Sequence, residues 1–279
     1  MINRFILILL LVVVFSSCRT YRHVYSPSPA NNPFFNSKGD AQLAAYYSGG
    51  SGTQGEGIRD KNEGFDIQGA YAVGKHFAIT GSYFFRKERD LCPEDIFDTS
   101  TVDYRRNLAD IGAGFFIPMN ENENIFFNVY GGLGFGKFSI RDVGLKGALP
   151  YTRYHNANVK KWFLQSSFNF LTDETFAFGI NLKFSFLRFG NISTNYEMEE
   201  QAYFSLDRLD KRTFTVFEPS MNAAYRIPGM DWLKVEGAFG FAASYSEQNA
   251  LSRSLNGSIG LVFDVGSLSW KKIKSADTK

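Results

Sequence analysis

The sequence has little cysteine, little histidine and almost no net charge. Among its 279 residues there are two cysteines and three histidines, and the formal net charge is +2. So few cysteines do not indicate a disulfide framework. A nearly neutral chain also lacks the excess of lysine and arginine that is typical of nucleic-acid-binding proteins, and we expect no nucleic acid partner.

The N-terminal apolar run is too short to cross a membrane as a helix. Phe5–Phe15 contains eleven apolar residues, whereas a helical span needs about twenty. A basic residue, Arg4, precedes the run, and the small residues Ser16 and Ser17 follow it. This order is typical of a secretory signal peptide and predicts an exported protein.

Cys18 comes directly after the two serines. The segment therefore resembles the bacterial lipobox, in which the signal is cut before a cysteine that carries acyl chains, although Phe15 stands where leucine is usual. The resemblance implies a signal peptide over residues 1–17 and a lipid on Cys18 that anchors the chain in a membrane. An ordinary cleaved signal and an uncleaved anchor are the alternatives. With Cys18 acylated, Cys92 would have no partner in the chain.

The segment after Cys18 is rich in proline and in turn-forming residues. The stretch RTYRHVYSPSPANNPFFNSKGD contains three prolines, which indicates an extended tether. We therefore expect a lipidated tether over 18–38, a folded domain over 39–266 and a polar tail over 267–279.

Beyond residue 38, apolar residues alternate with small or polar ones, which predicts strands with two different faces. In TFAFGINLKFSF, for example, every second residue from Phe176 to Phe186 is large and apolar. Ten such segments occur, over 39–49, 63–73, 75–88, 103–117, 124–140, 159–171, 174–190, 213–226, 231–246 and 253–265.

The connections between these segments are alternately long and short. The longest span 50–62, 89–102, 141–158 and 191–212. This alternation predicts an up-and-down antiparallel barrel with tight turns at one end and large loops at the other. An even number of strands would place both termini at the short-turn end. Eight strands, with the N-terminal segment outside the barrel, are an alternative.

The second face of the predicted strands is made mostly of small and polar residues, with scattered charges of both signs. Such a face suits a narrow polar lumen, so we expect the apolar face to meet lipid in an all-β, transmembrane β-barrel. A soluble lipid-binding barrel is the alternative. Candidates for aromatic belts at the membrane interfaces are Tyr83, Phe85, Trp162, Tyr225, Trp232 and Tyr245.

The lipobox, the Pro/Asn tether and the Phe/Gly-rich meander together resemble the outer-membrane β-barrel proteins of Bacteroidota-type Gram-negative bacteria. The resemblance is one of pattern over most of the mature chain. It implies short periplasmic turns and long outer loops. Surface-exported lipoproteins of that group carry acidic residues after the lipidated cysteine, whereas Arg19–His23 has none. By this analogy, the lipid lies in the inner leaflet of the outer membrane and the N-terminus on the periplasmic side.

One segment departs from the alternation. In FTVFEPSMNAAY, Phe214 and Val216 stand at even positions and Met221 at an odd one, so these apolar residues would face opposite sides of a regular strand. Pro219, between them, cannot donate a hydrogen bond to a neighbouring strand. These features predict a β-bulge near Glu218. The bulge would shape the barrel or, as the alternative, narrow its lumen. GFGKFSI shows a similar change of parity.

Three histidines leave little scope for acid–base catalysis. His23 lies in the tether and His76 at a short turn, so His155 is the histidine on the long-loop side. A pair with a loop carboxylate such as Asp142 would suit a hydrolase at the outer rim, as in the known barrel enzymes of the outer membrane. No spacing or motif supports that pair.

Two long loops carry further candidate groups. The spacing of the acidic residues in one loop fits no calcium-binding pattern, so we expect no metal site; they are Asp90, Glu94, Asp95, Asp98 and Asp103. In the same loop, Cys92 is expected to be a free thiol, and a bond to a partner chain is the alternative. The loop 191–212 has mixed charge and aromatic residues expected to be exposed, Tyr203 and Phe204, and would form a binding surface or carry a short helical turn.

We therefore expect a non-enzymatic outer-membrane lipoprotein that serves as a structural or interaction module of the envelope, or as a subunit of a larger envelope complex. A narrow pore is the first alternative, although small barrels are generally filled by their own side chains. An outer-rim hydrolase or lipid-modifying enzyme is the second. No catalytic residue, metal or cofactor is predicted. The expected partners are outer-membrane lipid and envelope proteins that contact the loops or turns.

Overall fold

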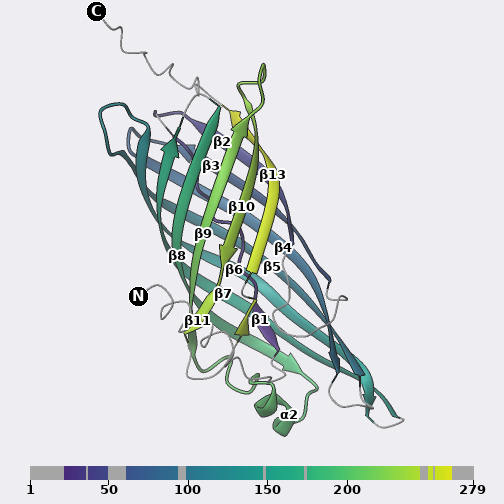
Figure 1. Cartoon of the computed structure of the whole chain (residues 1–279). Helices are drawn as coiled ribbons and strands as arrows, with labels where there is room; N and C mark the ends of the chain where they lie inside the picture. Colours follow the sequence, from purple (N-terminus) through teal and green to yellow (C-terminus); the bar gives the residue numbers. More distant parts are fainter. Residues whose placement is uncertain are drawn as a thin grey trace, which may run out of the picture.

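Ten antiparallel strands form a closed barrel (Figure 1). The computed structural model describes residues 22–35, 37–49, 61–93, 99–146, 149–172, 175–245, 251–253 and 255–265. The barrel strands are β2 (Ala41–Gly49), β3 (Lys61–Ala72), β4 (Phe77–Pro93), β5 (Thr99–Pro118), β6 (Ile125–Lys146), β7 (Leu149–Leu171), β8 (Phe176–Thr194), β9 (Thr213–Arg226), β10 (Leu233–Phe241) and β13 (Leu255–Val265). Pairing of β13 with β2 closes the barrel. The predicted all-β, up-and-down barrel of ten strands is confirmed, and the eight-stranded alternative is wrong.

Four short elements accompany these strands. They are β1 (His23–Tyr25), α2 (Met198–Tyr203), β11 (Ala243–Tyr245) and β12 (Leu251–Ser252). Strand β11 continues the course of β10 along β9, and α2 confirms the short helical turn predicted in the loop 191–212. In the part of the chain that the structure describes, no helix is both long and apolar enough to cross a membrane.

Strand β8 shows why these sequences form barrel strands. From Phe176 to Phe186 every second side chain faces outward, and the side chains between them are buried in the lumen. The outward side chains form an apolar strip whose length matches the roughly 9–11 residues of a transmembrane β-strand. The same alternation exposes four of the predicted belt residues on the outer face, namely Tyr83, Trp162, Tyr225 and Trp232.

The predicted β-bulge near Glu218 is not present. Strand β9 pairs with β8 in regular register through Glu218 and Pro219. Phe214, Val216 and Glu218 are all buried, so the strand keeps its period of two. The parity of the apolar residues changes because the lumen itself is apolar at this level, where a large cluster of buried side chains collects. The change of parity in GFGKFSI has the same cause, because Phe138 faces the lumen and belongs to this buried cluster.

Pro219 is accommodated by a break in the neighbouring strand. The pairing with β9 stops at Gly240, opposite Ser220, and resumes at Ala243, opposite Phe217, so on this side the unpaired stretch of β9 is Glu218 and Pro219. The missing N–H of proline therefore coincides with a gap in the ladder. A register shift within the barrel does occur, but it lies in β7 at Asn156–Asn158.

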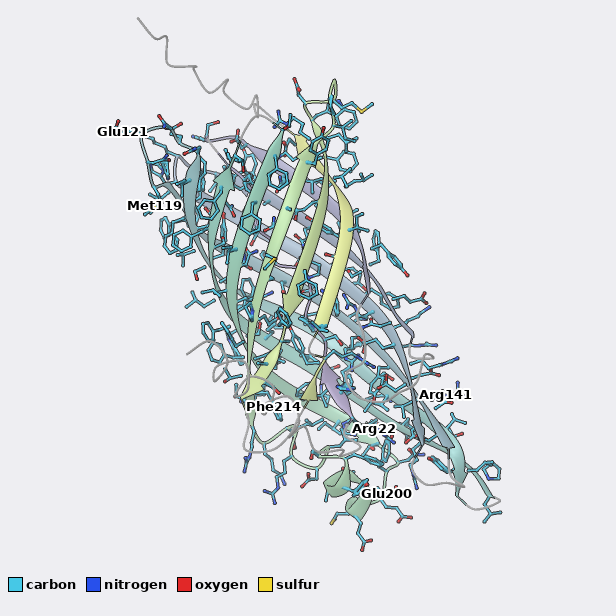
Figure 2. The ribbon with its side chains drawn as sticks, viewed as in Figure 1. Arg22, Met119, Glu121, Arg141, Glu200 and Phe214 are labelled. Carbon is cyan, nitrogen blue, oxygen red and sulfur yellow. The ribbon has the colours of Figure 1, made fainter. Side chains whose placement is uncertain are left out.

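The connections define two different ends of the barrel. The short-turn end carries Met119 and Glu121, whereas the long-loop end carries Arg141, Glu200 and Phe214 (Figure 2). Two predicted long loops, 89–102 and 141–158, are mostly strand, because β4, β5, β6 and β7 extend into them. Their residues include many with high β-propensity, and cross-strand pairing satisfies their backbone groups.

The N-terminal segment 22–35, expected to be a tether, lies inside the barrel, and we call it the lumenal strap. Arg22 lies at the long-loop end, opposite to Met119 and Glu121 (Figure 2). Phe34 and Phe35 pack at the short-turn end. The described chain therefore starts at the long-loop end, and not at the short-turn end as expected. The order of long and short connections determines where β2 begins, but it does not constrain a segment that passes through the lumen first.

Candidate functional site

Charged side chains of both signs line the lumen. In the described part of the protein, eight lysines and arginines and eight aspartates and glutamates are buried. A buried charge without a partner is costly, and many of these charges pair across the interior. Lys234 lies 2.6 Å from Asp264, for example, and Lys161 and Lys183 both contact Asp110. The balance of charge does not favour a path for ions of one sign.

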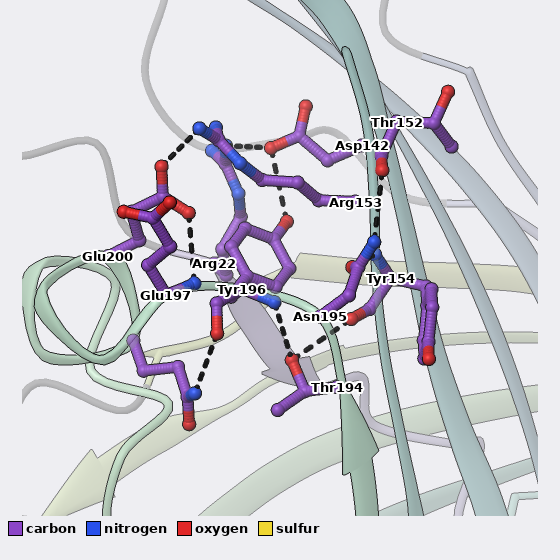
Figure 3. A network of polar contacts seen from close by, with 11 residues as sticks. Arg22, Asp142, Thr152, Arg153, Tyr154, Thr194, Asn195, Tyr196, Glu197 and Glu200 are labelled. Carbon is purple, nitrogen blue, oxygen red and sulfur yellow. Dashed lines mark hydrogen bonds and ion pairs between the residues drawn. The ribbon is translucent and has the colours of Figure 1, made fainter.

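A buried ion pair holds the strap at the long-loop end (Figure 3). The Arg22 guanidinium donates to Asp142 Oδ2 of β6 at 2.7 Å, and both side chains are fully buried. The Tyr196 hydroxyl donates to the same oxygen at 3.1 Å. Arg22 also lies 3.9 Å from the centroid of the Phe204 ring. These contacts join the strap both to the barrel wall and to the connection between β8 and β9.

The connection that carries Tyr196 covers this ion pair. Glu197 and Glu200 form a capping box at the start of α2, and Arg153 of β7 forms an ion pair with Glu200 (Figure 3). Burial raises the pKa of the Tyr196 hydroxyl above its ordinary value. Tyr196 therefore remains a neutral hydrogen-bond donor to Asp142.

Next along the strap, β1 pairs in parallel with β12. The backbone N–H of Arg253 donates to the Tyr25 carbonyl at 2.9 Å, and the Arg106 guanidinium donates to the His23 carbonyl. The Tyr25 hydroxyl lies 3.2 Å from both carboxylate oxygens of Glu218. Backbone groups of the strap thus find partners inside the barrel, as buried backbone requires.

Glu88 connects the strap to two arginines of the interior. The Ser26 hydroxyl donates to Glu88 Oε1 at 2.6 Å. Arg253 Nε lies 3.1 Å from Glu88 Oε2, and Arg106 forms an ion pair with the same carboxylate. Charge-assisted contacts of this kind are stronger than neutral hydrogen bonds, so they fix the strap at this level.

Asn32 is the centre of a cluster of polar side chains. Its Oδ1 accepts hydrogen bonds from Ser167 at 2.8 Å, Asn169 at 3.1 Å and Asn128 at 3.2 Å. Gly179 of β8 leaves room for the cluster, because a Cβ there would lie only 2.7 Å from Asn32 Nδ2. The barrel wall is therefore shaped to fit the strap.

Two aromatic residues hold the strap at the short-turn end. Phe34 packs against Phe126, Leu171, Ala177 and Ala224, and Phe35 packs against Ala72, Ala78, Phe116 and Tyr130. The rings of Phe35 and Phe116 meet edge to face with their centroids 5.6 Å apart. Burying one phenylalanine side chain stabilises by about 1.5–3 kcal/mol, so this pair is a strong anchor.

Little space remains beside the strap. One cavity borders Pro27–Ala30 and another borders Asn31, and each has a volume of about 10 Å³. A volume of this size holds about one water molecule. Neither of these two cavities would admit a larger solute.

A larger depression, of about 910 Å³, lies on the barrel wall across β3, β4, β5 and β6. Apolar residues with large exposed fractions surround it, namely Tyr71, Ile79, Ile111 and Leu133. Glycines, which project no side chain, line it as well, among them Gly69, Gly81 and Gly131. Thr80, Ser82 and Asp110 of the lumenal side also contribute to its lining, so the depression spans the barrel wall where glycines make it thin.

His155 does not lie at an exposed rim. Its side chain is fully buried in the lumen, and its ring centroid lies 6.4 Å from that of Phe138. Neither ring nitrogen has a hydrogen-bond partner among the described residues. Asp142, the carboxylate considered as its partner, instead bonds Arg22 and Tyr196. The pair required by the hydrolase hypothesis is not formed.

The two described acidic residues of 89–103, Asp90 and Asp103, lie on different faces of the barrel wall. Asp90 forms an ion pair with Arg253 and lies 4.0 Å from His23, inside the barrel. Asp103 pairs with Arg89 on the outer face. Within the described ranges, no group of residues has the composition of a metal site. The acidic residues that lie outside the described residues are Glu94, Asp95 and Asp98.

The remaining predicted residues have different outcomes. Cys18 lies outside the described residues, and Cys92 is placed in β4 opposite Ser100 through its backbone alone. Tyr203 is exposed as predicted, but Phe204 is buried, because its ring packs on the Arg22 guanidinium. A polar lumen with charges of both signs was expected, whereas the strap that these charges hold was not expected there.

The geometry thus defines a closed β-barrel with an apolar outer face and a lumen filled by its own N-terminal segment. No family model matches the chain, and no curated protein matches its sequence. Among solved structures, the translocator domain of the autotransporter NalP from Neisseria meningitidis is 12% identical with a TM-score of 0.43, covering 82% of this chain and 89% of that one.

Two further similar structures are outer-membrane proteins. The outer membrane protease OmpT from Escherichia coli is 12% identical with a TM-score of 0.44, covering 85% of this chain and 100% of that one. An outer membrane channel from Pseudomonas putida F1 is 8% identical with a TM-score of 0.39, covering 84% of this chain and 99% of that one. At such values these likenesses concern the general type of fold and assign no activity.

Proposed function

We propose that this chain is an outer-membrane β-barrel lipoprotein that is closed by its own N-terminal segment and serves as a structural or interaction module of the cell envelope. The observation that carries the proposal is the lumenal strap. Its contacts run from the Arg22–Asp142 ion pair at the long-loop end to the Phe35 cluster at the short-turn end. A lumen filled along this length favours a closed module over a pore.

The outer face of the barrel supports a membrane location. Large exposed apolar residues cover its strands, and such an extensive apolar surface is unfavourable in water but is required in hydrocarbon. At the short-turn end, Trp232 stacks on Phe263 with ring centroids 5.9 Å apart, and Phe77 meets Phe115 at 5.4 Å. Aromatic residues at this level are typical of the interfacial belt of a transmembrane barrel.

The strap also limits where a lipid on Cys18 would lie. Cys18 precedes Arg22 by four residues, which span at most about 14 Å when fully extended. Because Arg22 lies at the long-loop end, an acylated Cys18 would lie near that end as well. Transmembrane barrels of this kind have their long loops outside, so we place this lipid at the outer leaflet instead of the inner leaflet suggested by the residues after Cys18.

Exposed apolar side chains at the long-loop end support an interaction role. Met198 and Tyr203 of α2 are 83% and 67% exposed, and Leu149 at the start of β7 is 74% exposed. Met198 and Tyr203 lie in the connection between β8 and β9, and Leu149 lies at the outer end of β7. All three are beyond the apolar strips of the strands, where lipid would not cover them. A partner protein of the envelope that buries them would gain apolar contact area.

Planar-bilayer recording of the full-length protein tests the closed lumen. We expect no discrete conductance steps, because the strap and the paired charges fill the barrel. Heat-dependent migration on a gel would verify that the reconstituted protein is folded, and a porin added to the same bilayer would verify that pores are detectable. Regular steps from the folded wild-type protein would overturn the closed-barrel proposal in favour of a pore.

A further inference from the structure

A row of exposed basic residues crosses five neighbouring strands on the outer face of the barrel. We call this row the basic collar. It consists of Lys87 on β4, Arg105 on β5, Lys137 on β6, Lys160 on β7 and Arg188 on β8. All five side chains are exposed.

The collar marks one edge of the apolar outer face. On each strand, the collar residue is the first charged outward residue met when moving along the apolar strip toward the long-loop end. On β8, Arg188 follows Phe184 and Phe186, and on β7 Lys160 comes next to Trp162. Aromatic residues followed by lysine or arginine are typical of the level at which lipid chains give way to headgroups.

Collar residues of like charge face one another directly. Lys87 lies opposite Arg105 in the pairing of β4 with β5, and Lys160 lies opposite Arg188 in the pairing of β7 with β8. Like charges at directly opposite positions destabilise a sheet. Two such pairs in one row therefore indicate that anions from outside the chain balance the charge.

Lys137 connects the two pairs. It lies opposite Asn107 of β5 and Asn158 of β7, each of which is two residues from a collar residue on its own strand. The row is therefore continuous across the sheet, since diagonal neighbours at this spacing are within reach of long side chains. The two asparagines add neutral hydrogen-bond donors between the cations.

In the part of the chain that the structure describes, few carboxylates lie on this surface. Glu63 lies opposite Lys87, and Asp103 pairs with Arg89 at 2.6 Å. Strands β7 and β8 contain no aspartate or glutamate at all. Among the described residues, none of the five collar residues forms an ion pair.

Among the residues that the structure describes, the opposite edge of the apolar face has no comparable row. The exposed charged residues around the short turns are of both signs; they include Lys75, Glu121, Glu123 and Asp231. If charged residues bordered the apolar face only to keep the rims of the barrel hydrated, both ends would carry the same kind of row. The asymmetry therefore points to an anionic ligand on the long-loop side alone.

We propose that the basic collar binds the phosphate groups of a multiply phosphorylated lipid in the leaflet that surrounds the long-loop end. Lys137, Lys160 and Arg188 form the main part of the site, because no carboxylate of β7 or β8 competes for them. Arginine presents a fork that matches phosphate oxygens, and lysine supplies a compact charge. The acyl chains of the lipid would lie against the neighbouring apolar strips. The inference rests on the proposed membrane location but not on the closed lumen.

Retention of diphosphoryl lipid A by the full-length protein in neutral detergent tests this site. Bound lipid is counted by native mass spectrometry for the wild-type protein and for Lys137→Gln/Lys160→Gln/Arg188→Gln. Each basic residue near an anionic lipid surface strengthens lipid binding by a factor of roughly ten or less. We therefore expect lipid A retention by the triple variant to fall by about 10²-fold. Higher salt should weaken retention by the wild type, since the collar is exposed.

A second triple variant controls for net charge. Lys75→Gln/Lys211→Gln/Arg212→Gln removes the same charge from exposed positions outside the collar and should retain lipid A like the wild type. Equal losses in both triple variants would overturn the site, as would wild-type retention of dephosphorylated lipid A at the same level. Bilayer recording does not depend on this result, so failure of the collar and failure of the closed barrel are distinguishable.

Discussion

Replacing Phe34 and Phe35 together with alanine is expected to open the barrel. The two rings are buried at the short-turn end, and each contributes about 1.5–3 kcal/mol to docking of the strap. Losing both weakens docking by about 3–6 kcal/mol, which raises the population with an undocked strap by about 10²- to 10⁴-fold. In planar bilayers we expect intermittent conductance steps from Phe34→Ala/Phe35→Ala where the wild-type protein gives none.

A matched variant on the outer face separates this effect from a general loss of aromatic contacts. Phe77→Ala/Phe115→Ala removes another edge-to-face pair, with ring centroids 5.4 Å apart, from the lipid-facing surface. It leaves the strap untouched and should remain silent in the bilayer. If the Phe34/Phe35 variant folds, judged by heat-dependent migration, and is also silent, then the strap is not what closes the lumen.

Asp142→Ala is expected to cause the largest loss of stability from a single substitution at the long-loop end. It removes a buried carboxylate that accepts hydrogen bonds from Arg22 and Tyr196. Removing one partner of a buried ion pair typically costs about 3–5 kcal/mol, because the remaining charge stays desolvated. The midpoint of guanidinium unfolding in lipid vesicles should fall accordingly.

Two comparisons test whether the loss comes from the ion pair. Asp103→Ala removes the carboxylate of an exposed pair with Arg89 and should leave the midpoint unchanged, since such pairs contribute little. Asp142→Ala/Arg22→Leu removes both charges and should recover part of the loss, which a double-mutant cycle would quantify. Additive losses from the two single variants would mean that Arg22 and Asp142 do not act together.

The barrel could be predicted from the sequence because its strands obey a simple rule. In β8, outward phenylalanines alternate with small and polar residues, and a period of two leaves a single assignment of faces. The rule led to a wrong result at Phe214 and Val216, where apolar residues face an apolar part of the lumen. Alternation shows that two faces differ, but it does not show that the inner face keeps one polarity throughout.

The strap could not be predicted because it has no periodicity of its own. Asn32, Phe34 and Phe35 lie in a proline-rich stretch, which is typical of an extended linker. Their partners come from strands that are distant in the sequence, as with Asn128 and Asn169. A weak signal was present, since two adjacent phenylalanines are unusual in a solvated tether, and the small lumenal residues left room for a further segment.

The most direct test of the central claim is to locate the residues before the strap relative to the two ends of the barrel. Single cysteines at Thr20, Tyr203 and Glu121 would be introduced in a Cys92→Ser background and exposed to a membrane-impermeant maleimide in intact and lysed cells. Tyr203, the last residue of α2, reports on the long-loop end (Figure 1), and Glu121 reports on the short-turn end (Figure 2). If the strap passes through the lumen, Thr20→Cys will label with Tyr203→Cys in intact cells, and Glu121→Cys will label only after lysis. Labelling of Thr20→Cys together with Glu121→Cys would contradict the threaded barrel.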